Sequence, residues 1–138
     1  MSKLIELIKN NDCDYIGKVD INIINEAQEK LNIKFPEEII EYISEFGVLS
    51  YGSNEINGLG TNSYLNIVNA TIDARNNFTK FPNGLFVIQD IGINDLLILS
   101  DSFNNIYEWN GDSYKLIFNS FYDFLNQEIF KNEKYICL

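Results

Sequence analysis

The stretch FPEEIIEYISEFGVLSYGSNEINGLG, residues 35–60, begins with an amphipathic helix that has a proline start and a glycine stop. Pro36 suits the first helical position, where its missing N–H costs nothing, and two glutamates follow where the helix dipole favours negative charge. Gly47 can adopt the left-handed conformation that ends a helix. The buried face of this helix is predicted to comprise Ile39, Ile40, Ile43 and Phe46.

A loop of small residues follows this helix and surrounds Tyr51. Residues 55–59 are predicted to form a strand or a strand end, with Asn57-Gly58 as a turn signal. Tyr51 lies between serine and glycine and is not easily buried. Two interpretations of it stay open: an exposed aromatic anchor for a protein partner, or a ring folded back over the helix.

Two further helices are predicted on the N-terminal side of this stretch. Residues 2–10 place apolar side chains along one side of a short helix. Asp20 can cap a second helix, whose buried face is expected to include Ile24, Ala27 and Leu31. Residues 11–18, between the two helices, are interpreted as a polar connection.

On the C-terminal side, residues 64–78 return to a helical period, in which Leu65, Val68 and Ile72 are expected to face the same way. Pro82-Asn83-Gly84 then breaks the chain. Four strands are predicted beyond it, at residues 85–91, 95–100, 105–110 and 113–118. Their connections are too short for crossover helices, so the sheet should be antiparallel. On the third strand, Trp109 is expected to face the core.

The chain ends in one more predicted helix, which begins at Ser120 as its cap. Its buried face is expected to comprise Phe121, Phe124, Leu125 and Ile129. The order of the elements predicts an α+β fold, with N-terminal helices, an antiparallel meander and a C-terminal helix packed on the sheet. The length suits one domain over residues 1–138.

The net charge of −10, from 20 acidic and 10 basic residues, favours a basic partner. Phosphate binding needs clustered lysine and arginine, and Arg75 is the only arginine, so nucleic acid is not expected as a ligand. No apolar run approaches the length of a membrane helix, and residues 1–10 lack the core of a signal peptide. With Cys13 and Cys137 interpreted as free thiols, the expected location is the cytoplasm.

The chain has no histidine, which excludes histidine-based triads and the usual zinc motifs. A carboxylate-based hydrolase would need two acids that converge in one pocket, and the candidates are Asp90, Asp95, Asp101 and Glu108. Acids at strand ends are more often solvated turn residues. No cofactor or metal is expected: Gly58-Leu59-Gly60 lacks the third glycine of a dinucleotide loop, and the acidic stretch at residues 12–23 has isoleucine where calcium ligands are required.

Taken in order, several blocks of the chain resemble the SUKH superfamily, the SMI1/KNR4-like domains. Residues 24–47 are similar to that family's two helices joined by an apolar-proline link and closed by glycine. NEINGLG, residues 54–60, resembles its strand end, residues 81–110 resemble its strand pair ending near tryptophan, and residues 119–130 resemble its closing helix. The sequence departs from the family pattern at Asp90-Ile91-Gly92, where an isoleucine is inserted into the turn.

The resemblance implies a function that periodicity cannot reveal. Bacterial members of the family are typically immunity proteins that bind and block a toxin, often a nuclease, whereas fungal relatives act in cell-wall regulation. Usage rich in asparagine, isoleucine and lysine favours a bacterial source. We therefore expect an immunity protein that neutralises a cognate toxin with a basic surface, without catalysis and without a membrane partner. The alternative is a regulatory or scaffold module that has no toxin partner. The oligomeric state stays open.

The residues expected to contact such a partner are an aromatic side chain and acids from loops and strand ends. Aromatic side chains anchor protein interfaces, while charges steer the encounter. The predicted partner-binding residues are Tyr51, Glu55, Asp90, Asp95, Asp101, Glu108 and Asp112.

Overall fold

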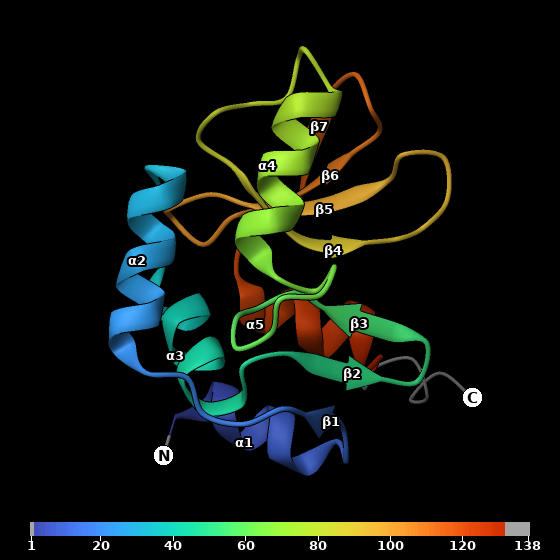
Figure 1. Ribbon diagram of the computed structural model, residues 1–138. Helices are drawn as coiled ribbons and strands as arrows, with labels where there is room; N and C mark the ends of the chain where they lie inside the picture. The colour runs from blue at the N-terminus through green and yellow to red at the C-terminus, as the bar shows by residue number, and fades with distance from the viewer. Residues whose placement is uncertain (1, 132–138) are drawn as a thin grey trace, which may run out of the picture.

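A computed structural model describes residues 2–131 as helices around two antiparallel sheets (Figure 1). The helices are α1 (Lys3–Asn10), α2 (Ile21–Leu31), α3 (Glu37–Phe46), α4 (Ile67–Asn77) and α5 (Phe121–Asp123), which continues as a π-helical segment, η1 (Phe124–Ile129). The strands are β1 (Asp14–Tyr15), β2 (Leu49–Tyr51), β3 (Asn54–Ile56), β4 (Phe86–Asp90), β5 (Leu97–Ser100), β6 (Ile106–Trp109) and β7 (Tyr114–Phe118). The predicted α+β class is confirmed.

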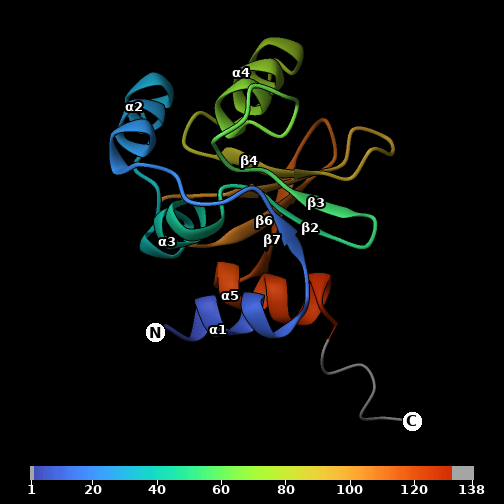
Figure 2. The same ribbon diagram turned by 60° about the horizontal axis from the view of Figure 1, so that its bottom comes forward.

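The larger sheet is the predicted meander, with strand order β4-β5-β6-β7 and every pair antiparallel. Its strands begin and end within two residues of the predicted limits. Both faces of the sheet are covered at β4 and β5, so the side chains of these two strands are buried and only Asp90, at the end of β4, is exposed. Figure 2 shows α4 on one side of this sheet and α1 with α5 on the other.

The smaller sheet, in the order β1-β2-β3, was only partly predicted. Residues 14–15 were expected in a polar connection, but they pair with Leu49 and Ser50 of β2. The turn between β2 and β3 lies at Gly52, where φ is +60°, and not at Asn57-Gly58. Asn57 instead crosses to the large sheet, because its backbone N–H donates to the Ile88 carbonyl at 2.8 Å. It therefore joins the two sheets.

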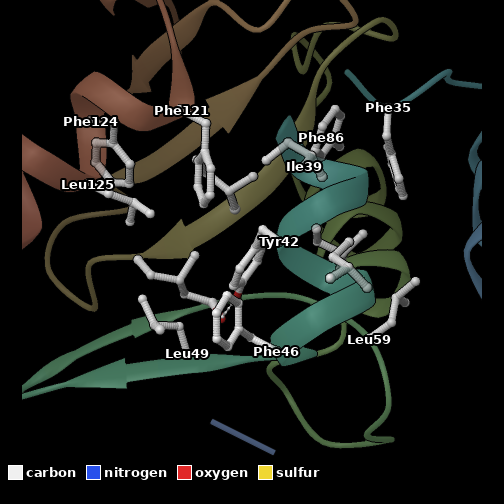
Figure 3. Close-up of a cluster of buried hydrophobic side chains, with 14 of the residues drawn as sticks. Phe35, Ile39, Tyr42, Phe46, Leu49, Leu59, Phe86, Phe121, Phe124 and Leu125 are labelled. Atoms are coloured by element: carbon white, nitrogen blue, oxygen red, sulfur yellow. Dashed lines mark hydrogen bonds between the residues drawn. The ribbon is translucent and has the colours of Figure 1, made fainter. Parts of the chain in front are cut away.

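The main core lies between α3, the helices around it and one face of the large sheet (Figure 3). The predicted buried face of α3 is confirmed for Ile39, Ile43 and Phe46, while Ile40 is half-buried. Tyr42, which was not predicted to be buried, is fully enclosed, and its hydroxyl donates to the Ile56 carbonyl at 2.8 Å. This hydrogen bond ties the centre of α3 to the end of β3.

A second, smaller cluster lies on the other face of the sheet, under α4. Trp109 is fully buried there, as predicted, and its ring packs edge-on against Phe78 and Phe81 with centroids 5.6 and 5.5 Å away. Its indole N–H has no hydrogen-bond partner among the described residues. Burial of the ring against two other aromatic rings offsets the desolvation of this single N–H.

The expected buried face of α4 is only partly right. The helix begins at Ile67, because the Asn66 side chain caps it by accepting hydrogen bonds from the backbone N–H groups of Val68 and Asn69. Val68 is buried as expected, whereas Ile72 is 38% exposed. The side chains that α4 buries are Ile67, Val68, Thr71 and Ala74.

The final helix begins as predicted, and the predicted buried residues are confirmed. Three side chains from different segments accept its first backbone N–H groups. Ser120 Oγ accepts from Asp123 at 2.9 Å, Asn104 Oδ1 accepts from Phe121 at 3.1 Å, and Glu38 Oε1 accepts from Tyr122 at 2.8 Å. The helix start is thereby fixed to α3 and to the β5–β6 loop.

No helix in residues 2–131 is long and apolar enough to cross a membrane. Cys13 is a half-buried free thiol whose Sγ lies 3.2 Å from the Ile8 carbonyl. The prediction for Cys137 falls outside the described residues.

Candidate functional site

A hollow with mixed polar and apolar walls lies between α4 and the β4–β5 loop and has a volume of about 450 Å³. α4 forms one wall, and the end of β4 with the loop at residues 91–96 forms the other. The helix lies across β4 and β5 in Figure 1. We call this hollow the α4 groove. Its floor is apolar and comprises Ala70, Ala74, Phe78, Val87 and Leu97.

Carboxylates line the α4 groove from both walls. Asp73 projects from α4, while Asp90 and Asp95 come from the end of β4 and from the loop after it. Among residues 2–131, no lysine or arginine lines the groove. Asp90 Oδ1 accepts a hydrogen bond from the Gly92 backbone at 2.8 Å, whereas Asp73 and Asp95 have neither a salt bridge nor a hydrogen bond within the described chain. Two negative charges are therefore available to a partner.

Exposed aromatic and aliphatic side chains stand at the edge of the same groove. Tyr64 is 70% exposed and Ile93 is 59% exposed. The Tyr64 hydroxyl lies 2.8 and 2.9 Å from the two carboxylate oxygens of Glu55, and this hydrogen bond raises the pKa of Tyr64. Glu55, a predicted partner-binding residue, thus borders the groove through Tyr64.

Asp112 lies in the β6–β7 turn, at the same end of the sheet as the β4–β5 loop. The two turns touch, since a Cβ placed on Gly111 would lie 3.3 Å from the Asp95 Cβ. Asp112 accepts a hydrogen bond from Lys80 Nζ at 2.8 Å, and the bond raises the pKa of Lys80. Because both side chains are exposed, this pair contributes little to stability. Asp112 is thus partly neutralised beside the groove.

The structure places the remaining three predicted residues away from the groove. Tyr51 is half-buried at the end of β2, and its ring packs edge-on against Phe130 at 4.9 Å, so it folds back over the C-terminal helix rather than over α3. Glu108 lies on β6, 3.8 Å from Lys115 of β7. Asp101 lies in the β5–β6 loop, at the opposite end of the sheet.

The carboxylate of Asp101 is occupied by its own loop. Oδ1 accepts from the backbone N–H groups of Phe103 and Asn105 at 2.8 and 2.9 Å, and Oδ2 accepts from the Tyr107 hydroxyl at 2.8 Å. Burial alone would raise the pKa of Asp101, but the hydrogen bonds from Asn105, Tyr107 and Phe103 outweigh burial and lower it. The Asp101 side chain therefore stabilises the conformation of the β5–β6 loop.

Two of the four carboxylates considered for a hydrolase, Asp90 and Asp95, do line one groove. Both are exposed to water. Carboxylate-pair catalysis depends on an environment that separates the two acids, usually by enclosing one of them in apolar surroundings. The open groove lacks such an enclosure for either side chain. No group of three acidic or cysteine side chains in residues 2–131 is placed to hold a metal ion.

The residues of α4 that line the groove were not predicted from the sequence. With Asn66 as the cap, Asn69, Asp73 and Asn77 recur every four residues and form one polar stripe of α4. Ala70 and Ala74 form the stripe beside it. The capping signal of Asn66 was present in the sequence, and it marks where this helix begins.

Comparison with known proteins gives the family. The SUKH_5 family model, described as SMI1-KNR4 cell-wall, matches residues 1–131. The chain belongs to the SMI1-KNR4 family. A crystal structure of a protein from Pseudomonas syringae pv. tomato shares the SMI1-KNR4 fold of this chain, with a TM-score of 0.75 at 15% identity, over 96% of this chain and all of the other. No curated protein matches the sequence.

Proposed function

We propose that this member of the SMI1-KNR4 family is a cytoplasmic immunity protein that neutralises a cognate toxin by stoichiometric binding. The observation that carries the proposal is the α4 groove, which is bordered by acids and exposed apolar side chains and is lined by no basic residue in the described part of the chain. Such a surface combines the anchoring and the steering parts of a protein interface.

The charge of the chain supports a basic partner. Its net charge is −10, and a partner with a positive face, such as the substrate-binding face of a nuclease, would be attracted over distances up to about the Debye length, roughly 8–10 Å in physiological salt. An inhibitor that covers that face blocks substrate access without chemistry of its own. The proposed mechanism is therefore occupation of the toxin surface, with no bond made or broken.

A second candidate is a regulatory or scaffold module without a toxin partner. The description of the matched family model as SMI1-KNR4 cell-wall favours this alternative. It shares the α4 groove as a binding surface but assigns it a different protein. The identity of the protein encoded next to this chain separates the two candidates.

The deciding experiment co-expresses the chain with the protein encoded beside it. The immunity proposal predicts that the neighbour arrests growth when expressed alone, that co-expression restores growth, and that the two proteins purify together at equal stoichiometry. A matched control replaces this chain with another acidic protein of similar size and charge, which should not restore growth.

The proposal is wrong if the neighbour stays toxic in cells that contain the folded chain, or if no complex forms with it. A neighbour that is harmless, but that binds the chain, would favour the regulatory alternative. Turnover of a substrate by the purified chain, abolished by Asp95→Asn, would instead establish an enzyme.

A further inference from the structure

We propose that the α4 groove binds one lysine or arginine side chain of the partner, presented between apolar residues of an exposed segment. This inference depends on the proposed function only for the identity of the partner. The groove is defined by its own walls, and its ligand chemistry can be tested with the toxin absent.

The floor fits the aliphatic stem of a long basic side chain. Ala70 and Ala74 are the smallest apolar residues that a helix can present, and they leave depth between α4 and the sheet. Phe78, Val87 and Leu97 complete an apolar surface on which methylene groups can be buried. A groove of about 450 Å³ holds such a side chain with its neighbours on either side.

The walls specify the charge at the end of that stem. Asp73 on the helix and Asp95 on the loop face a shared groove from opposite sides, and neither carboxylate has a partner among residues 2–131. A cation between them would gain charge-assisted hydrogen bonds without breaking any that exist. Amide groups of Asn69, Asn77 and Asn94 also line the groove and supply further oxygen acceptors.

The edge specifies what should flank the basic residue. Tyr64 and Ile93 are large, exposed and adjacent to the groove, so they offer apolar contacts to neighbouring residues of the bound segment. Glu55 holds the Tyr64 hydroxyl and therefore limits the positions of the ring. Phosphate-bearing ligands are disfavoured because the walls contain no cation.

The test uses NMR titration of the full chain with the peptide acetyl-Leu-Arg-Leu-amide. A matched peptide replaces arginine with citrulline, which keeps the shape and removes the charge. We expect shift changes clustered at the residues that line the groove, and a dissociation constant at least about fivefold weaker for the citrulline peptide, the effect of losing partly exposed charge-assisted contacts.

Two double variants test the walls. Asp73→Asn with Asp95→Asn removes the groove charges, and Asp14→Asn with Glu29→Gln removes the same charge from exposed residues that do not line the groove. The groove variant should weaken arginine-peptide binding about fivefold, and the control should not change it beyond the small effect of net charge. Equal urea midpoints of both variants and the parent show that folding is intact.

The inference is overturned if the arginine and citrulline peptides bind equally, if shift changes lie outside the groove, or if both double variants behave alike. The same variants are then mixed with the protein encoded beside the chain. Strong toxin binding that is unaffected by the groove variant would leave the immunity function standing and remove the groove from it. Peptide binding without toxin binding would support the ligand chemistry of the groove and would contradict the immunity function.

Discussion

A single carboxylate, that of Asp101, organises the β5–β6 loop. It accepts backbone hydrogen bonds from Phe103 and Asn105 and one from the Tyr107 hydroxyl on the next strand. The same loop supplies Asn104, which has a φ of +71° and caps the final helix through Phe121. The charge on Asp101 is therefore connected, through one loop, to the start of α5.

Because these hydrogen bonds lower the pKa of Asp101 in the folded state, its charged form stabilises the fold at neutral pH. The contribution is fully present above the unfolded-state value, about 3.9, and is lost as the pH falls through the lower folded-state pKa. We expect Asp101→Asn to reduce the free energy of unfolding by about 1 kcal/mol at pH 7, after allowance for its partial exposure to solvent.

Urea unfolding between pH 7 and pH 2 measures this contribution. The difference between the parent and Asp101→Asn should shrink steadily below pH of about 4. Asp14→Asn serves as the control, because this exposed acid has no side-chain partner in the described chain, and it should leave the unfolding midpoint nearly unchanged. A difference that stays constant with pH would show that the charge on Asp101 is not the cause.

At the scale of elements, a close backbone contact joins the end of α3 to the chain that leaves β3. A Cβ placed on Gly58 would lie 1.6 Å from the Gly47 carbonyl oxygen, a separation that no folded structure accepts. The Leu59 N–H donates to that same carbonyl at 3.1 Å, and the Leu59 side chain is buried. NEINGLG thus encodes a close backbone contact rather than the turn that was expected.

We expect Gly58→Ala to destabilise the fold by roughly 3 kcal/mol or more, because one of two buried backbone segments has to move. Gly84→Ala is the matched control, since its Cβ would meet no atom within 4 Å and its φ is not positive. Thermal unfolding followed by circular dichroism compares the two variants. Equal midpoints for the two alanines would contradict the close contact.

The elements with local signals were predictable from the sequence. Asp20 and Ser120 marked helix starts by their capping chemistry, and short turns between apolar runs defined the meander. The pairing of β1 with β2 was not predictable, because a strand of two exposed residues has no periodicity, and its partner lies more than thirty residues away.

The candidate site was predicted on its sheet side only. Asp90 and Asp95 stood out as acids at strand ends. Asp73 did not, because the buried face predicted for its helix included Ile72, which is exposed, and missed Ala74, which is buried. Whether Asp90 and Asp95 share a groove with Asp73 depends on tertiary packing of α4 on the sheet, which no local pattern reports.

At the scale of the whole molecule, the net charge of −10 should act on the rate of association. If the proposed toxin is the partner, lysine substitutions at Asp73, Asp90 and Asp95 are expected to slow association with it and to flatten the dependence of the association rate on salt. The paired control reverses Asp14, Glu29 and Glu37, which do not line the groove. Stopped-flow mixing at several ionic strengths measures how the association rate of each variant depends on salt. Equal salt dependence for the groove variant and the control would refute localised steering.

The position of Trp109 has a practical consequence. It is the only tryptophan of the chain, it is fully buried, and its ring contacts Phe78, which also forms part of the groove floor. A ligand that binds in the α4 groove and contacts Phe78 changes the surroundings of the indole. The intrinsic fluorescence emission of Trp109 should therefore report occupancy of the groove without any label. Phe118, whose ring packs against Phe124 on the opposite side of the sheet, gives no such optical signal. Trp109 is thus an intrinsic fluorescent probe of ligand binding in the groove.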